Sequence, residues 1–218
     1  MYRRTRPRQY FSLRSRPLSP YLLLIIFIFS IVALVFPIFL CLSSYTFLNY
    51  FLWTYFTSLF VSYSSSYIGI LFLLILVLIF YNIIKTIEIN FGTKLLFTLY
   101  LVSAMGTALL YFLIWTFLRT LGIDPYTIPF IGLASGALLG VICFLIYFNL
   151  RQEFMFLFFF LPIRMRGSLL IWLLILIRLI PGLLFALVDL RYLAIYLPDL
   201  GGILASYIFY KYKYRLRI

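Results

Sequence analysis

Long apolar runs, separated by short polar or basic stretches, make up most of this chain. A membrane-crossing helix needs about 20 apolar residues at a rise of 1.5 Å per residue. Six runs fit this requirement, and they lie at Tyr21–Ser43, Ser66–Ile84, Leu95–Leu118, Thr127–Leu150, Gly167–Leu187 and Leu193–Tyr210. The sixth run is shorter than the others, and Pro181 and Gly182 could end the fifth early. The pattern predicts an all-α bundle of six transmembrane helices.

The composition supports a membrane protein. Of the 218 residues, 66% are hydrophobic and 11% are charged, whereas soluble domains are about 25% charged. A soluble domain of this length needs a more polar exterior than this chain can supply. We therefore expect a multi-pass integral membrane protein, in the cell membrane or in an internal membrane, with the lipid bilayer as its surroundings.

The basic residues fall on alternate sides of the predicted spans. With the N-terminus inside, the inner segments contain Arg3, Arg4, Arg6, Arg8, Arg14, Arg16, Lys85, Lys94, Arg151, Arg164, Arg166, Lys211, Lys213, Arg215 and Arg217. The outer segments contain Arg119 and Arg191. Because cytoplasmic loops are enriched in Lys and Arg, this division predicts cytoplasmic N- and C-termini. Basic tails at 1–20 and 211–218 would then flank a membrane domain at 21–210, and they favour anionic lipid headgroups over nucleic acid as partners.

Small residues mark two of the predicted helices. Gly132, Gly136 and Gly140 recur every four residues in the fourth span, while Gly201 and Gly202 lie in the sixth. Stripes of this kind let neighbouring backbones come close in a membrane. The spacing predicts that the fourth and sixth helices pack against each other.

Two polar residues lie at a similar depth in these two helices. Ser135 is about 12 Å and Asp199 about 9 Å from the outer ends of their spans, at the helical rise. A carboxylate inside a span is a functional-site candidate, although Pro198 and Asp199 are also typical of a helix start. Ser135 could equally be a packing residue that bonds its own helix. Both alternatives stay open on the sequence.

Other chemistry is sparse. The chain has no histidine, and Cys41 and Cys143 do not have the spacing of metal ligands, so no metal or other cofactor is expected. Arg178 lies inside the fifth span, where it could pair with Asp189 or Asp199 or extend toward the interface. A channel or transporter is disfavoured because such proteins usually contain paired charges within the membrane.

Four stretches, in order, resemble the rhomboid superfamily over about residues 50–210. They are LWTYFTSLF at Leu52–Phe60, KTIEINFGTKLLFTLYLVSA at Lys85–Ala104, ASGALLG at Ala134–Gly140 and PDLGGILASYIFY at Pro198–Tyr210. The family implies a six-helix fold and an intramembrane serine protease, in which a serine in the fourth helix and a histidine in the last form the catalytic pair. On this resemblance Ser135 is at the nucleophile position.

The chain departs from the family pattern at the positions that carry the chemistry. Asp199 stands where the family has its histidine, and Ser62, Tyr67 and Leu71 stand where it has the oxyanion donors, two histidines and an asparagine. A carboxyl group titrates near 4 and histidine near 6.5, so a carboxylate is the weaker base at neutral pH. Losing one oxyanion donor typically costs about 100-fold to 1000-fold in rate.

The last stretch and FFFLPIRMRGSLLIWLLIL, at Phe158–Leu176, also resemble derlins, the non-proteolytic branch, which lack the serine. These features favour a pseudoprotease that binds transmembrane segments of client proteins. The short sixth span and the uncharged aromatic first loop further suggest local thinning of the bilayer. The alternative is an intramembrane serine endopeptidase in which Ser135 attacks and Asp199 accepts the proton.

Overall fold

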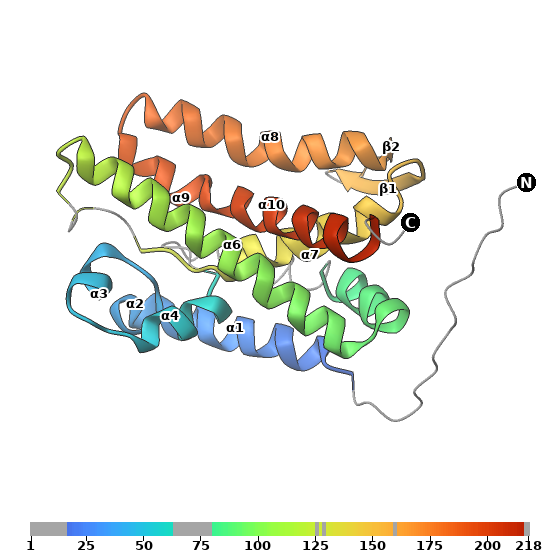
Figure 1. Cartoon of the computed structure of the whole chain (residues 1–218), viewed down its shortest axis with the longest axis horizontal. Coiled ribbons are helices and arrows are strands. Elements are labelled where there is room, and N and C mark those ends of the chain that lie inside the picture. Colours follow the sequence, from blue (N-terminus) through green and yellow to red (C-terminus); the bar gives the residue numbers. More distant parts are fainter. Residues whose placement is uncertain (1–16, 63–79, 125–126, 128–129, 159–160, 216–218) are drawn as a thin grey trace, which may run out of the picture.

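A computed structural model describes residues 17–62, 80–124, 127, 130–158 and 161–215 of the chain. The protein is mostly helical (Figure 1). Its elements are α1 (Ser19–Val35), α2 (Pro37–Leu40), α3 (Ser44–Leu48), α4 (Trp53–Thr57), the 3-10 turn η1 (Ser58–Phe60), a helix over 80–91, α6 (Thr93–Thr120), α7 (Ala134–Phe148), β1 (Glu153–Phe158), β2 (Leu161–Arg166), α8 (Gly167–Ala186), η3 (Leu190–Tyr192), α9 (Leu193–Tyr196), α10 (Pro198–Tyr210) and the π-helical η4 (Lys211–Arg215). The strands β1 and β2 form an antiparallel hairpin with Glu153 opposite Arg166, which the all-α prediction did not include.

Three helical segments in the described part of the chain are long and apolar enough to cross a membrane. They are α6, α8 and a 25-residue run from Leu190 to Tyr214 that joins η3, α9, α10 and η4. The predicted spans Leu95–Leu118 and Gly167–Leu187 match α6 and α8 closely. Pro181 lies inside α8 and does not end it. The prediction of a short sixth span is wrong, because the 25 residues exceed the roughly 20 needed.

Two predicted spans are shorter than expected. The run Tyr21–Ser43 overlaps the 17-residue α1, which begins at Ser19 and ends before Pro37, and contains the separate turn of α2. The run Thr127–Leu150 contains the 15-residue α7, which begins only at Ala134. Shortly before it, Ile131 pairs with Leu42 in a β-bridge through two backbone hydrogen bonds of 2.8 and 2.9 Å. Of the predicted span Ser66–Ile84, only 80–84 falls among the described residues, and these are helical.

The described helices and strands begin and end at two opposite ends of the molecule. The start of α1, the 80–91 helix, the β1–β2 hairpin and the end of α10 lie at one end, and α2, α3, α4 and the α8–α9 connection lie at the other (Figure 1). Among the described residues, the segments at the first end contain Lys85, Lys94, Arg151, Arg164, Arg166, Lys211, Lys213 and Arg215, whereas the end of α6 and the α8–α9 connection contain Arg119 and Arg191. The charge asymmetry expected from the sequence therefore has a spatial counterpart.

Aromatic side chains pack together at the end of the molecule that contains most of the described basic residues. Phe91 of the 80–91 helix lies 5.7 Å from Phe144 of α7, between ring centroids, and 6.3 Å from Tyr214 of η4. Tyr214 also packs on Phe148 at 4.8 Å. Contacts of these sizes are the tilted and edge-on arrangements that aromatic rings prefer. They bring three segments, distant in sequence, to one point.

A buried carboxylate fixes the start of α1. Glu88 accepts hydrogen bonds from the backbone N–H groups of Leu18 and Ser19 and from the hydroxyl of Thr93. The first N–H groups of a helix have no partner within it, so Glu88 caps α1 from another helix. Burial alone would raise the pKa of Glu88, but the accepted hydrogen bonds outweigh it and hold the pKa below its ordinary value of 4.5.

We expect Glu88→Gln to lower the free energy of unfolding by about 1–2 kcal/mol at neutral pH, the usual worth of a helix cap. Because the folded pKa of Glu88 is depressed, its contribution is complete above about pH 4.5 and is lost as the pH falls through the folded pKa. Denaturation at pH 7 and at about pH 3 should therefore give a difference between wild type and Glu88→Gln that shrinks in acid. Glu153→Gln, at an exposed glutamate, is the control. An equal difference at both pH values would contradict the cap.

Candidate functional site

Small residues bring α6, α7 and α10 into backbone contact. A Cβ added at Gly106 of α6 would lie 2.5 Å from the carbonyl oxygen of Gly201, and one added at Gly202 would lie 2.7 Å from the carbonyl carbon of Gly136. One added at Gly140 would lie 2.6 Å from the carbonyl oxygen of Gly202. Real Cβ atoms essentially never approach other atoms this closely. The contact between the fourth and sixth predicted spans is thus present, with glycine required on both sides.

The structure changes two details of this contact. Gly132 is buried but precedes α7, which begins at Ala134, so it is not part of the helical stripe. The sequence analysis also missed α6 as the third partner, although Ser103, Gly106 and Thr107 form a small-residue patch there. Ser103 and Thr107 are fully buried and face Gly140 and Gly136.

Ser135 and Asp199 meet at the outer part of this three-helix contact. The Ser135 hydroxyl donates a hydrogen bond of 2.8 Å to Oδ1 of Asp199. Asp199 lies in the first turn of α10, directly after Pro198, and is 2% exposed. A Cβ added at Gly136 would come within 3.0 Å of the same Oδ1, so the absence of a side chain there gives the carboxylate its space.

Arg178 of α8 completes the cluster. Its Nε lies 3.1 Å from Oδ2 of Asp199, and the side chain of Arg178 is 30% exposed where that of Asp199 is 3% exposed. Of the partners that the sequence left open for Arg178, the structure selects Asp199. An unpaired carboxylate in an apolar interior is strongly unfavourable, and the guanidinium offsets this cost.

The arrangement determines what Asp199 can do. One carboxylate oxygen accepts from Ser135 and the other holds Arg178. The Ser135–Asp199 contact has the length needed for proton transfer from a nucleophile to a base. Taking up the proton, however, would neutralise the carboxylate and leave the Arg178 charge without its counter-ion. The ion pair therefore works against a role of Asp199 as the base.

Of the three positions that correspond to the family's oxyanion donors, the structure describes one. Ser62 follows η1, and its backbone N–H donates to the Ser30 hydroxyl at 2.9 Å. Its neighbour Val61 accepts the N–H of Ala134 at 3.0 Å, which ties this loop to the start of α7. Tyr67 and Leu71 lie outside the described residues.

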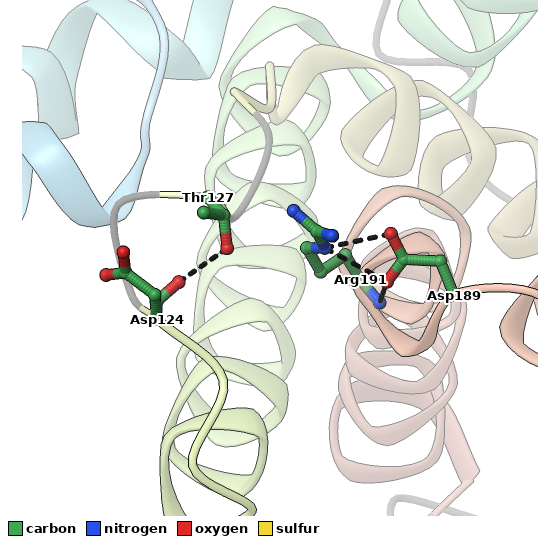
Figure 2. A network of polar contacts seen from close by, with 4 residues as sticks. All are labelled: Asp124, Thr127, Asp189 and Arg191. Atoms are coloured by element: carbon green, nitrogen blue, oxygen red, sulfur yellow. Dashed lines mark hydrogen bonds and ion pairs between the residues drawn. The ribbon is translucent and has the colours of Figure 1, made fainter.

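A second polar cluster lies around an open groove of about 620 Å³ that is lined by the loops after α6 and α8. Figure 2 shows its residues: Asp189 accepts from the backbone N–H and from Nε of Arg191, and the Thr127 hydroxyl donates to the carbonyl oxygen of Asp124. The backbone N–H of Arg191, with its guanidinium, holds the pKa of Asp189 below its ordinary value. These bonds span two or three residues and shape the loops.

Comparison with known proteins adds nothing to these observations, because no protein family, curated protein or solved structure matches the chain. The interpretation of the site therefore rests on its own geometry.

Proposed function

We propose that the chain is a rhomboid-like pseudoprotease with six transmembrane helices, which binds transmembrane segments of client proteins. The six-helix topology, with both termini on the cytoplasmic side, is supported by the two ends of the molecule. Eight of the described basic residues belong to segments at one end and two to segments at the other, and cytoplasmic loops are the ones enriched in Lys and Arg.

The observation that carries the non-catalytic part of the proposal is the Arg178–Asp199 ion pair. In the rhomboid-like position of the base, this chain has a carboxylate whose Oδ2 is 3.1 Å from a guanidinium. A general base has to take up a proton, and protonating Asp199 would leave the guanidinium of Arg178 without its counter-ion. The Ser135–Asp199–Arg178 cluster then acts as a connection between α7, α8 and α10.

Client binding is supported by the loose packing of α8. About 11% of the apolar stretch of α8 is buried, compared with 33% in α6 and 39% in the Leu190–Tyr214 run. Its buried residues, Leu170 and Gly182 together with Gly167, are near the two ends of the helix. A helix with so much free surface can receive a further transmembrane segment, and in lipid that association depends on close packing and on polar contacts.

One experiment tests both the client binding and the absence of proteolysis. The purified protein in lipid nanodiscs should crosslink to single-span peptides through a photoreactive residue at Ile177, which is 47% exposed on α8. This crosslinking should exceed that through Leu109 of α6, although Leu109 is more exposed, at 62%. It should neither cleave the peptides nor react with a fluorophosphonate probe beyond the level of Ser135→Ala. Labelling or cleavage that depends on Ser135 would establish the alternative, the serine endopeptidase that the 2.8 Å Ser135–Asp199 contact favours.

A further inference from the structure

Arg178 has more hydrogen-bonding capacity than the described part of the chain uses. A guanidinium has five N–H donors, and the contact with Asp199 engages Nε. Within the part of the chain that the structure describes, the two terminal nitrogens of Arg178 have no acceptor. In the apolar interior of a bilayer, unpaired donors are costly because water is scarce there.

The depth of Arg178 indicates where an acceptor would come from. At 1.5 Å per residue, Arg178 lies about 16 Å from Gly167 and about 12 Å from Ala186, the two ends of α8. The hydrocarbon core of a bilayer is about 30 Å thick, so Arg178 lies near its middle. Lipid phosphates lie at the boundary of this core, whereas a side chain of a neighbouring transmembrane helix can reach the middle directly.

The surface around Arg178 indicates what kind of partner fits. The side chain of Arg178 is itself 30% exposed, the adjacent Ile177 is 47% exposed, and Arg178 is the one charged residue in the sequence of α8. Apolar side chains in a membrane pack against lipid tails about as favourably as against another helix. The guanidinium is therefore the feature of this face that can distinguish one transmembrane segment from another.

From these observations we infer that Arg178 selects client transmembrane segments that carry a carboxyl group near the middle of the span. This inference rests on the proposed client binding and names its specificity. A carboxyl oxygen of the client accepts from the terminal nitrogens of Arg178, while Nε keeps Asp199. Charge-assisted hydrogen bonds to a guanidinium are among the strongest in proteins, and their two-pronged geometry favours a carboxyl group.

The test compares leucine-rich single-span peptides that differ at one residue. Peptides with Asp, Asn or Leu at the centre, and one with Asp within a turn of the outer end, are offered to the full-length protein in nanodiscs, with crosslinking through Ile177. We expect capture of the central-Asp peptide to be roughly tenfold above that of the Leu peptide, the ratio that one good polar contact supplies, with Asn between them. The peptide with Asp near its end should be captured like the Leu peptide.

Two variants locate the effect at Arg178. Arg178→Leu/Asp199→Leu removes both charges without leaving an unpaired carboxylate, and it should capture the Asp and Leu peptides equally. Asp199→Leu keeps the guanidinium and should retain the preference. Monodisperse elution of each variant confirms that it is folded.

Three other outcomes would overturn the selection by Arg178, and they differ in what they mean for client binding. Capture through Ile177 could exceed capture through Leu109 and yet be the same for every central residue of the peptide. That result would overturn the selection by Arg178 and leave client binding intact. If capture through Ile177 is no greater than capture through Leu109, both the selection by Arg178 and the proposed client binding are wrong. If phosphatidylglycerol in the nanodisc abolishes the preference that phosphatidylcholine permits, the group bound by Arg178 is an anionic lipid headgroup and the inference is wrong.

Discussion

Replacing Gly202 by leucine is expected to abolish most of the folded protein. The position lies where α10 meets α7, and an added Cβ would be 2.7 Å from the carbonyl carbon of Gly136 and 2.9 Å from the Thr107 hydroxyl. Overpacking a well-packed core costs about 1–3 kcal/mol when side chains can shift, and here the obstacle is backbone. The loss should exceed that range, with Gly202→Ala affected in the same direction and less severely.

The measurement is the free energy of unfolding in mixed micelles, followed by circular dichroism as denaturing detergent is added, together with the yield of monodisperse protein. Leu204→Phe is the matched control, because it enlarges a residue of the same helix that is 63% exposed. It should be close to wild type. If Gly202→Leu were as stable as Leu204→Phe, α7 and α10 would not be in backbone contact.

This contact is also where sequence reasoning worked best. The four-residue spacing of glycines predicted which faces of the fourth and sixth spans meet, and the helical rise predicted that Ser135 and Asp199 would be level. Both predictions depend on periodicity, which is a local property of the chain. The partner α6 was missed because its small residues at the four-residue spacing, Ser103 and Thr107, carry hydroxyl groups, and Gly106 is the one glycine beside them.

Other features depended on information that hydropathy does not contain. The segment 127–133 is apolar enough for a helix, but Ile131 pairs with Leu42 in an extended conformation, so α7 starts at Ala134. The β1–β2 hairpin likewise occupies an apolar and aromatic stretch that was expected to be a connection. In each case backbone pairing with another segment decided the conformation.

The partner of Arg178 is a similar case. The sequence allowed Asp189, Asp199 or no partner, since the choice depends on how α8 is rotated about its axis. Leu170, Leu174 and Gly182 share a face of α8 with Arg178 by four-residue spacing, and Leu170 and Leu174 pack in the core. The rotation set by these residues turns Arg178 toward α10, while Asp189 pairs with Arg191.

Replacing Arg178 and replacing Asp199, one at a time, should lower the free energy of unfolding by unequal amounts. Arg178→Leu leaves Asp199 as a carboxylate that is 3% exposed, with the Ser135 hydroxyl as its remaining partner. Breaking a buried ion pair from one side costs about 3–5 kcal/mol. Asp199→Leu should cost less, because the side chain of Arg178 is 30% exposed and a long arginine can extend toward the interface.

The double variant Arg178→Leu/Asp199→Leu should be more stable than Arg178→Leu alone, because it contains no orphaned charge. Unfolding free energies of the four proteins at neutral pH give the coupling between the two residues. Ser135→Ala serves as the control, since it removes a hydrogen bond to Asp199 and keeps the ion pair. It should cost about 1 kcal/mol. Additive losses in the double variant would mean that Arg178 and Asp199 do not stabilise each other, and the cluster would then no longer connect α8 to α10.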